Sequence, residues 1–299
     1  MSPNELPRRQ VDRVKPYHGD VGAQGTSDRN EVSRGVVRAP QELYPCYNNP
    51  MKIAVCLKQV PDTSDIKWSA ENTIIREGLL SILNPVDDYA LELAREVEGA
   101  EITAITMGPL MARAVLEYAI ARGCNEVILL SDKKFTGSDT LATAKVLSKA
   151  LSGFDLILCA KSAIDGETGQ VPPSTAQLLG IEFVSNICEI ISIKDNEITL
   201  KQKNEDGFTT ISANLPLVAS VVESDFEITP PKIQDYIRAQ QKEIKILGAA
   251  ELGIDESSCG TKGSPTMVSK VFRPVLNRSP KAVEGDFADF ILKKIGGEG

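Results

Sequence analysis

The chain has 299 residues, and its 33 lysine and arginine residues against 41 aspartate and glutamate residues give a formal net charge of −8. That length can bury a full hydrophobic core, and the acidic balance argues against nucleic acid or an anionic membrane as the main partner. No apolar run approaches the roughly 18 residues of a membrane-spanning helix, and the first residues lack the apolar segment of a secretory signal, so we expect no stable membrane insertion and a cytoplasmic protein.

Cysteine and histidine usage argues against metal and histidine chemistry. The six cysteines form no CxxC pair and no metal-like spacing. Cys56, Cys159 and Cys188 stand in apolar runs, which favours small buried core residues. The only histidine, His18, lies in a stretch that we expect to be disordered. We therefore predict no catalytic side chain and no metal site, and we expect any chemistry to belong to a bound cofactor or to the backbone.

The first fifty residues differ from the rest of the chain. Residues 1–50 are polar and mixed in charge, with neither strand nor helix periodicity, so we expect a disordered leader or an artefactual extension. From Met51 onward strand and helix patterns alternate, which predicts an α/β protein with a parallel sheet flanked by helices. The expected strands are 52–57, 101–107, 126–130 and 154–159, and the expected helices begin near residues 85, 109, 139 and 172.

Beyond residue 180 the pattern predicts an antiparallel addition to the sheet. Asp195-Asn196 and Asp206-Gly207 are typical hairpin turns between alternating or β-branched runs. A helix over 233–241, an extended arm from residue 253 and a final amphipathic helix over 287–295 follow. This pattern agrees equally well with an arm that wraps around a partner and with a helix that folds back on its own domain. We therefore expect a leader over 1–50, a nucleotide-binding domain over 51–252 and a partner-contacting arm over 253–299. The strands expected in the addition are 187–193, 197–203, 209–213 and 217–222.

The stretch from Leu156 to Pro173 carries the strongest functional pattern. A short apolar strand runs into a polar loop with Gly166 and Gly169, and Pro172 and Pro173 then suit the first turn of a helix. A loop at the carboxyl end of a parallel strand is where open α/β sheets hold phosphates. No GxxxxGK[ST] or GxGxxG motif is present, so an ordinary strand-to-helix turn stays equally open.

Two other turns follow expected strands with similar chemistry. Asn84-Pro85 predicts a helix start, since Asn can cap the first turn and Pro suits the first helical position. Met107-Gly108-Pro109 follows the second strand. Each turn alone fits plain helix capping, but the convergence of all three on one rim of one sheet favours a ligand site.

Five stretches of the chain, taken in order, carry a resemblance to a known family. They are IAVCLKQVPDT (53–63), SILNPVDDYALELA (81–94), AITMGP (104–109), AKSAIDGETGQVPP (160–173) and LGIDESSCGTKGSPTMVSKVFRP (252–274). Together they resemble the beta subunit of electron-transferring flavoprotein, over about residues 51–274. The resemblance implies a heterodimer with an alpha subunit that passes electrons through flavin to an acyl-CoA dehydrogenase or a related reductase. Any NADH-oxidising activity would require the alpha subunit.

The resemblance also implies a set of nucleotide contacts. Asp165 and Glu167 carry the same sign of charge as a phosphate and would not bind it directly, so we expect Asp165 to brace its own loop by accepting backbone N–H bonds. The implied contacts are Cys56, Asn84, Pro85, Asp87, Met107, Asp165, Gly166, Glu167, Thr168, Gly169, Gln170, Val171, Pro172 and Pro173.

The family has two branches, one with AMP as a structural nucleotide in the beta subunit and one with an FAD that exchanges electrons with NADH. CLKQVPDT and IIREGLLSILNPVDD (74–88) are more similar to the second, electron-bifurcating branch, so we expect FAD with NAD as donor and keep AMP as the alternative. Residues 226–244 carry less basic charge than the family's dehydrogenase-docking stretch, which leaves the dehydrogenase partner open. A nucleotide-dependent ligase of the ATP-pyrophosphatase type would need a Ser-Gly-Gly-x-Asp-Ser loop after the first strand, where this chain has Lys58-Gln59-Val60-Pro61.

Overall fold

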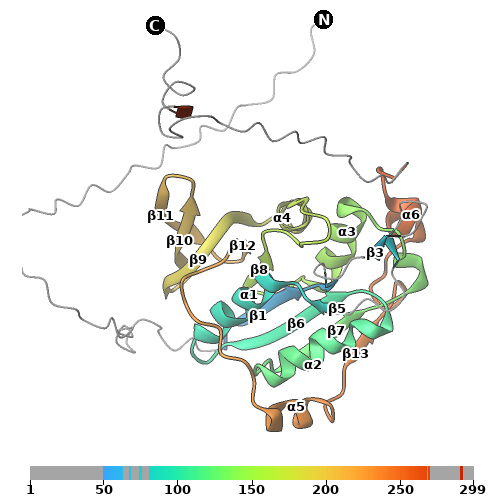
Figure 1. The fold of residues 1–299 in the computed structure, drawn as a ribbon, viewed down its shortest axis with the longest axis horizontal. Helices are drawn as coiled ribbons and strands as arrows, with labels where there is room; N and C mark the ends of the chain where they lie inside the picture. Colours follow the sequence, from blue (N-terminus) through green and yellow to red (C-terminus); the bar gives the residue numbers. More distant parts are fainter. Residues whose placement is uncertain are drawn as a thin grey trace, which may run out of the picture. The chain divides into compact units, whose positions relative to one another are not determined.

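The computed structural model describes residues 50–62, 67–68, 74–75, 81–267, 269 and 290–291 (Figure 1). The predicted leader therefore lies outside the described residues, except for Pro50. The predicted final helix also lies outside them, except for Phe290 and Ile291, which are helical. Among the described residues, no helix has both the length and the apolar character to cross a membrane.

A nine-stranded sheet forms the centre, in the spatial order β11-β10-β9-β12-β8-β1-β6-β7-β13. All neighbours from β9 to β13 pair in parallel, whereas β10 pairs antiparallel with β9 and with β11. The prediction of a parallel sheet with an antiparallel addition is confirmed. The strands are β1 (Lys52–Leu57), β6 (Glu101–Met107), β7 (Glu126–Leu130), β8 (Leu156–Ala160), β9 (Glu182–Lys194), β10 (Glu197–Asn204), β11 (Gly207–Asn214), β12 (Leu217–Val221) and β13 (Lys245–Leu247).

Two strands differ from the sequence prediction. β12 was expected in the antiparallel addition, but it lies between β8 and β9 and is parallel to both. All its residues are buried, as in an interior parallel strand covered on both faces, and that pattern outweighs its closeness in sequence to the hairpins. β13 was not predicted, because three residues are too few to show any periodicity.

Helices cover both faces of the sheet. Ile53 and Val55 of β1 pack with α1 (Pro85–Glu96) and α2 (Arg113–Ala121), whereas Ala54 belongs to the apolar cluster of α3 (Thr140–Ala150) and α4 (Val171–Leu179). This alternation follows from the two-residue period of a strand. The remaining helical elements are η2 (Leu110–Ala112), η3 (Lys133–Phe135), α5 (Ile233–Ala239), η4 (Glu256–Ser258) and α6 (Gly260–Gly263). The short strands β2 (Gln59–Pro61) and β5 (Ser81–Leu83) form one antiparallel pair, and β3 (Lys67–Trp68) and β4 (Ile74–Ile75) form another.

The strand order creates a switch point between β1 and β8. From β1 the chain adds β6 and β7 on one side, then returns to place β8 on the other side of β1. The connections that leave the carboxyl ends of β1 and β8 therefore lead to helices on opposite faces of the sheet, and we call the region at these two strand ends the β1–β8 crevice. Open α/β sheets bind their ligands at such a point.

The segment expected to begin an extended arm is folded back in its described part. α6 packs against η3, α3 and η4, and the amide of Thr261 donates to the carbonyl of Thr136 over 3.1 Å. Gly260 makes the close approach possible, because a Cβ there would lie 2.1 Å from the carbonyl oxygen of Lys134. Residues 256–258 and 260–263 at the start of the predicted arm are therefore helical, and small residues and hydroxyl groups pack this part against the same domain. Residues 270–289 lie outside the described residues.

Candidate functional site

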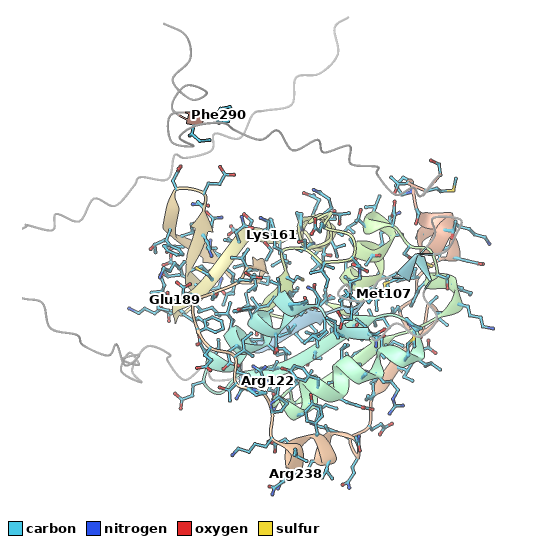
Figure 2. The ribbon with its side chains drawn as sticks, viewed as in Figure 1. Met107, Arg122, Lys161, Glu189, Arg238 and Phe290 are labelled. Carbon is cyan, nitrogen blue, oxygen red and sulfur yellow. The ribbon has the colours of Figure 1, made fainter. Side chains whose placement is uncertain are left out.

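The crevice between β1 and β8 brings together most of the predicted site residues. Cys56, near the end of β1, is the register partner of Cys159 in β8. The loop that follows β8 begins at Lys161, labelled in Figure 2, and runs to α4. Lys58, directly after β1, pairs across the crevice with Asp165, with 2.7 Å between Nζ and Oδ1.

Asp165 therefore acts differently from the prediction. It was expected to accept backbone N–H bonds of its own loop, but its carboxylate instead pairs with the ammonium group of Lys58. The two residues are 107 positions apart, so only the adjacency of β1 and β8 reveals the pair. The pair offsets one negative charge beside the loop, which lowers the repulsion that an anionic ligand would meet there.

Asn84 joins the start of α1 to the loop after β8. It occupies the N-cap position, but its side chain makes no capping hydrogen bond, contrary to the sequence prediction. The buried amide nitrogen instead donates to the carbonyl of Ser162 over 3.2 Å, and Oδ1 accepts the amide of Ile164 at 3.1 Å. Asn84 thus fixes the first part of the loop, because both of its amide atoms are committed to it.

Asp87 completes this connection from inside the helix. Only 2% of the residue is exposed, and its two carboxylate oxygens accept from the amide nitrogen of Lys58 at 2.6 Å and from Asn84 Nδ2 at 3.0 Å. Burial raises the pKa of Asp87 to about 7, although the hydrogen bonds and the charge of Lys58 lower it. Asp87 is therefore a buried group that holds β1, α1 and, through Asn84, the loop.

The second half of the loop presents unused backbone donors. The amides of Gly166 and Glu167 both donate to the carbonyl of Ala163, at 3.1 and 2.8 Å, which forms a tight turn. Within the described part of the chain, the next amides make no hydrogen bond, and α4 starts without a capping side chain. Free N–H groups beside a helix start form a local site for an anion. These amides belong to Thr168, Gly169, Gln170 and Val171.

The backbone at Gly169 suits the approach of a ligand. Its φ is +63°, which disfavours residues with a Cβ, and an added Cβ would lie 3.5 Å from the carbonyl oxygen of Lys161. Pro172 and Pro173 carry no N–H, so the donors end at Val171. This donor set fits a phosphate or pyrophosphate group.

The remaining predicted residues take peripheral positions. Pro85 is the exposed first residue of α1. Met107, labelled in Figure 2, ends β6 on the side of β1 away from β8 and packs against the cluster below α3 and α4. The sequence interpretation did not include Lys58, Ser162 and Ile164 in the site. Lys58 could have been found from its place directly after the first strand, where parallel-sheet ligands bind.

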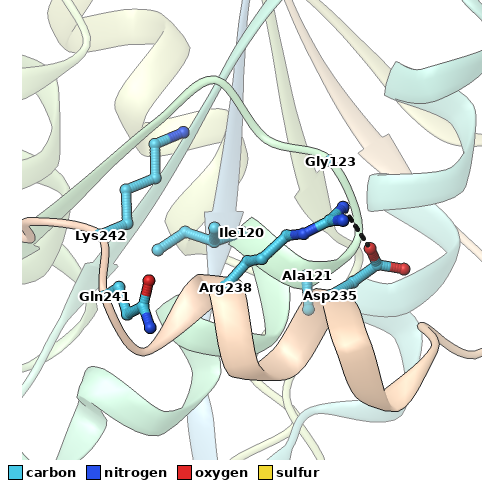
Figure 3. Close-up of a pocket in the computed structure, with 7 residues that line it drawn as sticks. All are labelled: Ile120, Ala121, Gly123, Asp235, Arg238, Gln241 and Lys242. Carbon is cyan, nitrogen blue, oxygen red and sulfur yellow. Dashed lines mark ion pairs between the residues drawn. The ribbon is translucent and has the colours of Figure 1, made fainter.

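A cavity elsewhere in the protein does not coincide with this crevice. It has a volume of about 430 Å³ and lies between the end of α2 and α5, at the edge of the sheet where β7 begins (Figure 3). Arg238 in its wall pairs with Asp235 at 3.6 Å, and Lys242 donates to the carbonyl of Asn125 at 2.6 Å. Because these cations are engaged and lie away from the carboxyl ends of β1 and β8, this cavity is not our candidate site.

The fold and the crevice together define an α/β protein with a loop of unbonded backbone amides, among the described residues, at the switch point of its sheet. The family model "Electron transfer flavoprotein domain" matches residues 71–252. The chain is 40% identical over 238 residues to "Electron transfer flavoprotein subunit beta" of Megasphaera elsdenii, an alignment that covers 75% of this chain and 88% of that protein. It is 37% identical over 262 residues to "Protein FixA" of Sinorhizobium fredii, with 83% and 92% of the two chains covered.

A third relative, "Electron transfer flavoprotein subunit beta" of Thermoanaerobacterium thermosaccharolyticum, is 38% identical over 248 residues, which cover 81% of this chain and 95% of that protein. The chain belongs to the electron transfer flavoprotein family, among proteins named as beta subunits and FixA. The resemblance proposed from the sequence is thereby confirmed.

Proposed function

We propose that this chain works as the beta subunit of a heterodimer, binds a flavin nucleotide in the β1–β8 crevice and passes electrons to an alpha subunit. The run of amides from Thr168 to Val171 carries the proposal, because it offers an anionic group donors that no described residue uses. Family membership supports the flavin and the partner subunit.

Each part of the crevice has a role in holding the nucleotide. The loop amides would donate to a phosphate or pyrophosphate, and Gly169 would let the backbone come close. Lys58 would keep Asp165 paired so that its charge does not repel the ligand. Asn84 and Asp87 would hold the loop in place from below.

We propose FAD as the nucleotide, and electron exchange with NADH in a flavin-based bifurcation, on the likeness of residues 56–63 and 74–88 to that branch. Bound FAD would supply the redox chemistry, whereas the chain would supply binding, orientation and electrostatics. The alternative is AMP, held in the same loop as a structural nucleotide. We also propose that an acyl-CoA dehydrogenase or a related reductase receives the electrons.

The stoichiometry of bound nucleotides distinguishes these possibilities. We would purify the full-length chain together with its alpha subunit, denature the complex and measure FAD and AMP per heterodimer. Two FAD and no AMP are the expected result. One FAD and one AMP would replace bifurcation by simple electron carriage, and the absence of any nucleotide from this chain would contradict the proposed site.

We further propose that the arm contacts the alpha subunit through residues after 267. Residues 260–266 already bond to the loop before α3, so they are engaged within their own domain. A chain that ends at Met267 should fold normally and associate more weakly with the alpha subunit on gel filtration. Unchanged association would contradict this assignment, and a chain that ends at Leu252 serves as the comparison that also loses the internal contacts.

A further inference from the structure

Two thiols lie side by side at the base of the crevice. Cys56 is the penultimate residue of β1, Cys159 is the penultimate residue of β8, and they are direct register partners in the parallel ladder. Residues paired in this way point to the same face of the sheet, and neighbouring strands lie about 4.8 Å apart. Both thiols belong to the apolar cluster under α3 and α4. Their spacing is therefore within the range of Cα separations that a disulfide accepts.

The two thiols differ in accessibility. Cys159 is 5% exposed, whereas Cys56 is half-buried at the edge that carries the crevice. A hydrogen bond with Cys56 and burial both raise the pKa of the Cys159 thiol well above its ordinary value. Cys56 is thus the thiol that a small oxidant would meet first, and Cys159 is its immediate neighbour.

The other described cysteines lack such a neighbour. Cys188 in β9 donates to the carbonyl of Lys201, and Cys259 lies against the carbonyl of Asp255. Cys124 is 3% exposed, and burial raises the pKa of its thiol to about 12. Within the described residues, only Cys56 and Cys159 are register partners of one another.

We propose that Cys56 and Cys159 form a redox-sensitive dithiol, which a peroxide converts to an intrachain disulfide across β1 and β8, and that a nucleotide in the crevice shields it. The shielding rests on the proposed function, because it needs a ligand in the crevice beside Cys56. The disulfide itself depends only on the register of the two strands.

The chemistry balances with a peroxide as the two-electron oxidant. The sulfur of Cys56 attacks the peroxide, so an S–O bond forms, the O–O bond breaks, and the released hydroxide leaves as water with the thiol proton. The sulfur of Cys159 then attacks that of Cys56, so an S–S bond forms, the S–O bond breaks, and a second water leaves with the proton of Cys159. Two thiols are oxidised, and hydrogen peroxide is reduced to water.

The experiment is peptide mapping of the purified full-length chain after graded hydrogen peroxide. Remaining thiols are alkylated, the chain is digested without reductant, and linked peptides are identified by mass spectrometry. We expect the Cys56 and Cys159 peptides to be joined, with the loss of two hydrogen atoms, and to separate again with dithiothreitol. Recovery of both residues as separate alkylated or sulfinic peptides would overturn the proposal.

Two variants sharpen this result. In Cys159→Ser the linked peptide should vanish, and Cys56 should accumulate as a sulfenic acid that dimedone traps. Cys188→Ala, a change at an equally buried cysteine of β9, should leave the link intact. If Cys56 formed a disulfide with another cysteine in Cys159→Ser, or no longer reacted with peroxide there, the assigned pair would be contradicted.

Nucleotide-loaded and nucleotide-stripped samples test the shielding. The rate of linkage should be several-fold lower in the loaded sample, and equal rates would overturn the shielding. Nucleotide content is measured on the same samples, so a chain that never holds a nucleotide would count against the proposed function, while the linked peptide would still support the dithiol.

Discussion

Two loops of this protein follow parallel strands and lead into helices, yet only one of them caps its helix with a side chain. The loop from Ser131 to Asp139 joins β7 to α3, and Asp139 caps that helix by accepting the amide of Ala142 at 2.9 Å. The loop from Lys161 to Gln170 joins β8 to α4, which has no capping side chain. We call the first loop the closed loop and the second, which we propose binds a nucleotide, the open loop.

The difference arises from a distant part of the chain. Gly260 donates to the hydroxyl of Ser138 at 3.0 Å, Ser264 Oγ accepts the amide of Asp139 at 2.8 Å, and Thr266 Oγ1 donates to Asp139 at 2.8 Å. This C-terminal segment occupies the position over the closed loop that we propose a nucleotide takes over the open one. Turn chemistry alone does not separate the two cases, because the covering group decides which donors remain free.

The largest expected effect concerns the pH dependence of stability at Asp87, below the open loop. Its pKa is raised to about 7 in the folded chain, so the folded state keeps the proton while the unfolded state releases it from about pH 4 upward. Stability from this group is complete below about pH 4 and is lost as pH rises through about 7, up to about 4 kcal/mol. The unfolding free energies of wild type and Asp87→Asn, measured by urea titration, should therefore change differently between pH 5 and pH 8. Parallel changes would contradict the raised pKa of Asp87.

Asp132 in the closed loop supplies the opposite case. Hydrogen bonds from the amides of Lys134 and Ala249 lower its pKa, so its contribution is present above the ordinary carboxyl pKa and is lost as pH falls. Between pH 5 and pH 8 the unfolding free energy of Asp132→Asn should therefore change with pH as that of wild type does. A slope like that of Asp87→Asn would remove the distinction between the two regions.

Gly260→Ala tests the closed loop by steric means. Its φ is +59° and the new Cβ would lie 2.1 Å from the carbonyl oxygen of Lys134, so we expect the C-terminal segment to undock and the unfolding free energy to fall by about 3 kcal/mol. The φ of Gly253 is +60°, but a Cβ added there would have nothing within 4 Å. Gly253→Ala should therefore lower the unfolding free energy by only about 1 kcal/mol. Equal losses in chemical denaturation would show that backbone strain, not the close contact, matters.

A pair of cap substitutions compares the two loops directly. Asp139→Ala removes a side chain that accepts from Ala142 and from Thr266, and we expect a loss of about 1–2 kcal/mol. Gln170 holds the same position before α4 without a side-chain bond, so Gln170→Ala should change stability by less than about 0.5 kcal/mol. Equal thermal shifts in the two variants would contradict the contrast between the loops.

The ion pair of the open loop should contribute little to stability but more to ligand binding. Lys58 and Asp165 have side chains that are 50% and 29% exposed, so Lys58→Met should cost less than about 1 kcal/mol. The same change leaves Asp165 unpaired beside the loop and should weaken nucleotide binding several-fold in calorimetry. Lys201→Met, which breaks a similar exposed pair with Glu189, is the control and should leave binding unchanged.

The strands and helices between residues 51 and 179 could be predicted from the sequence, because their apolar periodicity and the Asn-Pro and Gly-Pro pairs before helices are local features. The order of the strands was not predicted, and the Lys58–Asp165 pair and the Cys56–Cys159 pair both depend on β1 and β8 being neighbours. The docking of residues 260–266 was missed for the same reason, since small polar residues gain their role only from the loop that they cover.

The most direct test of the account is the nucleotide content of Gly169→Val in the chain purified with its alpha subunit. The φ of Gly169 is +63°, so valine would distort the loop and move its free amides. Gly99→Val, at a φ of +74° with nothing within 4 Å, imposes similar strain beyond the end of α1. We predict that Gly169→Val loses most of the nucleotide while Gly99→Val keeps it, and full nucleotide content in Gly169→Val would contradict the assignment of the site.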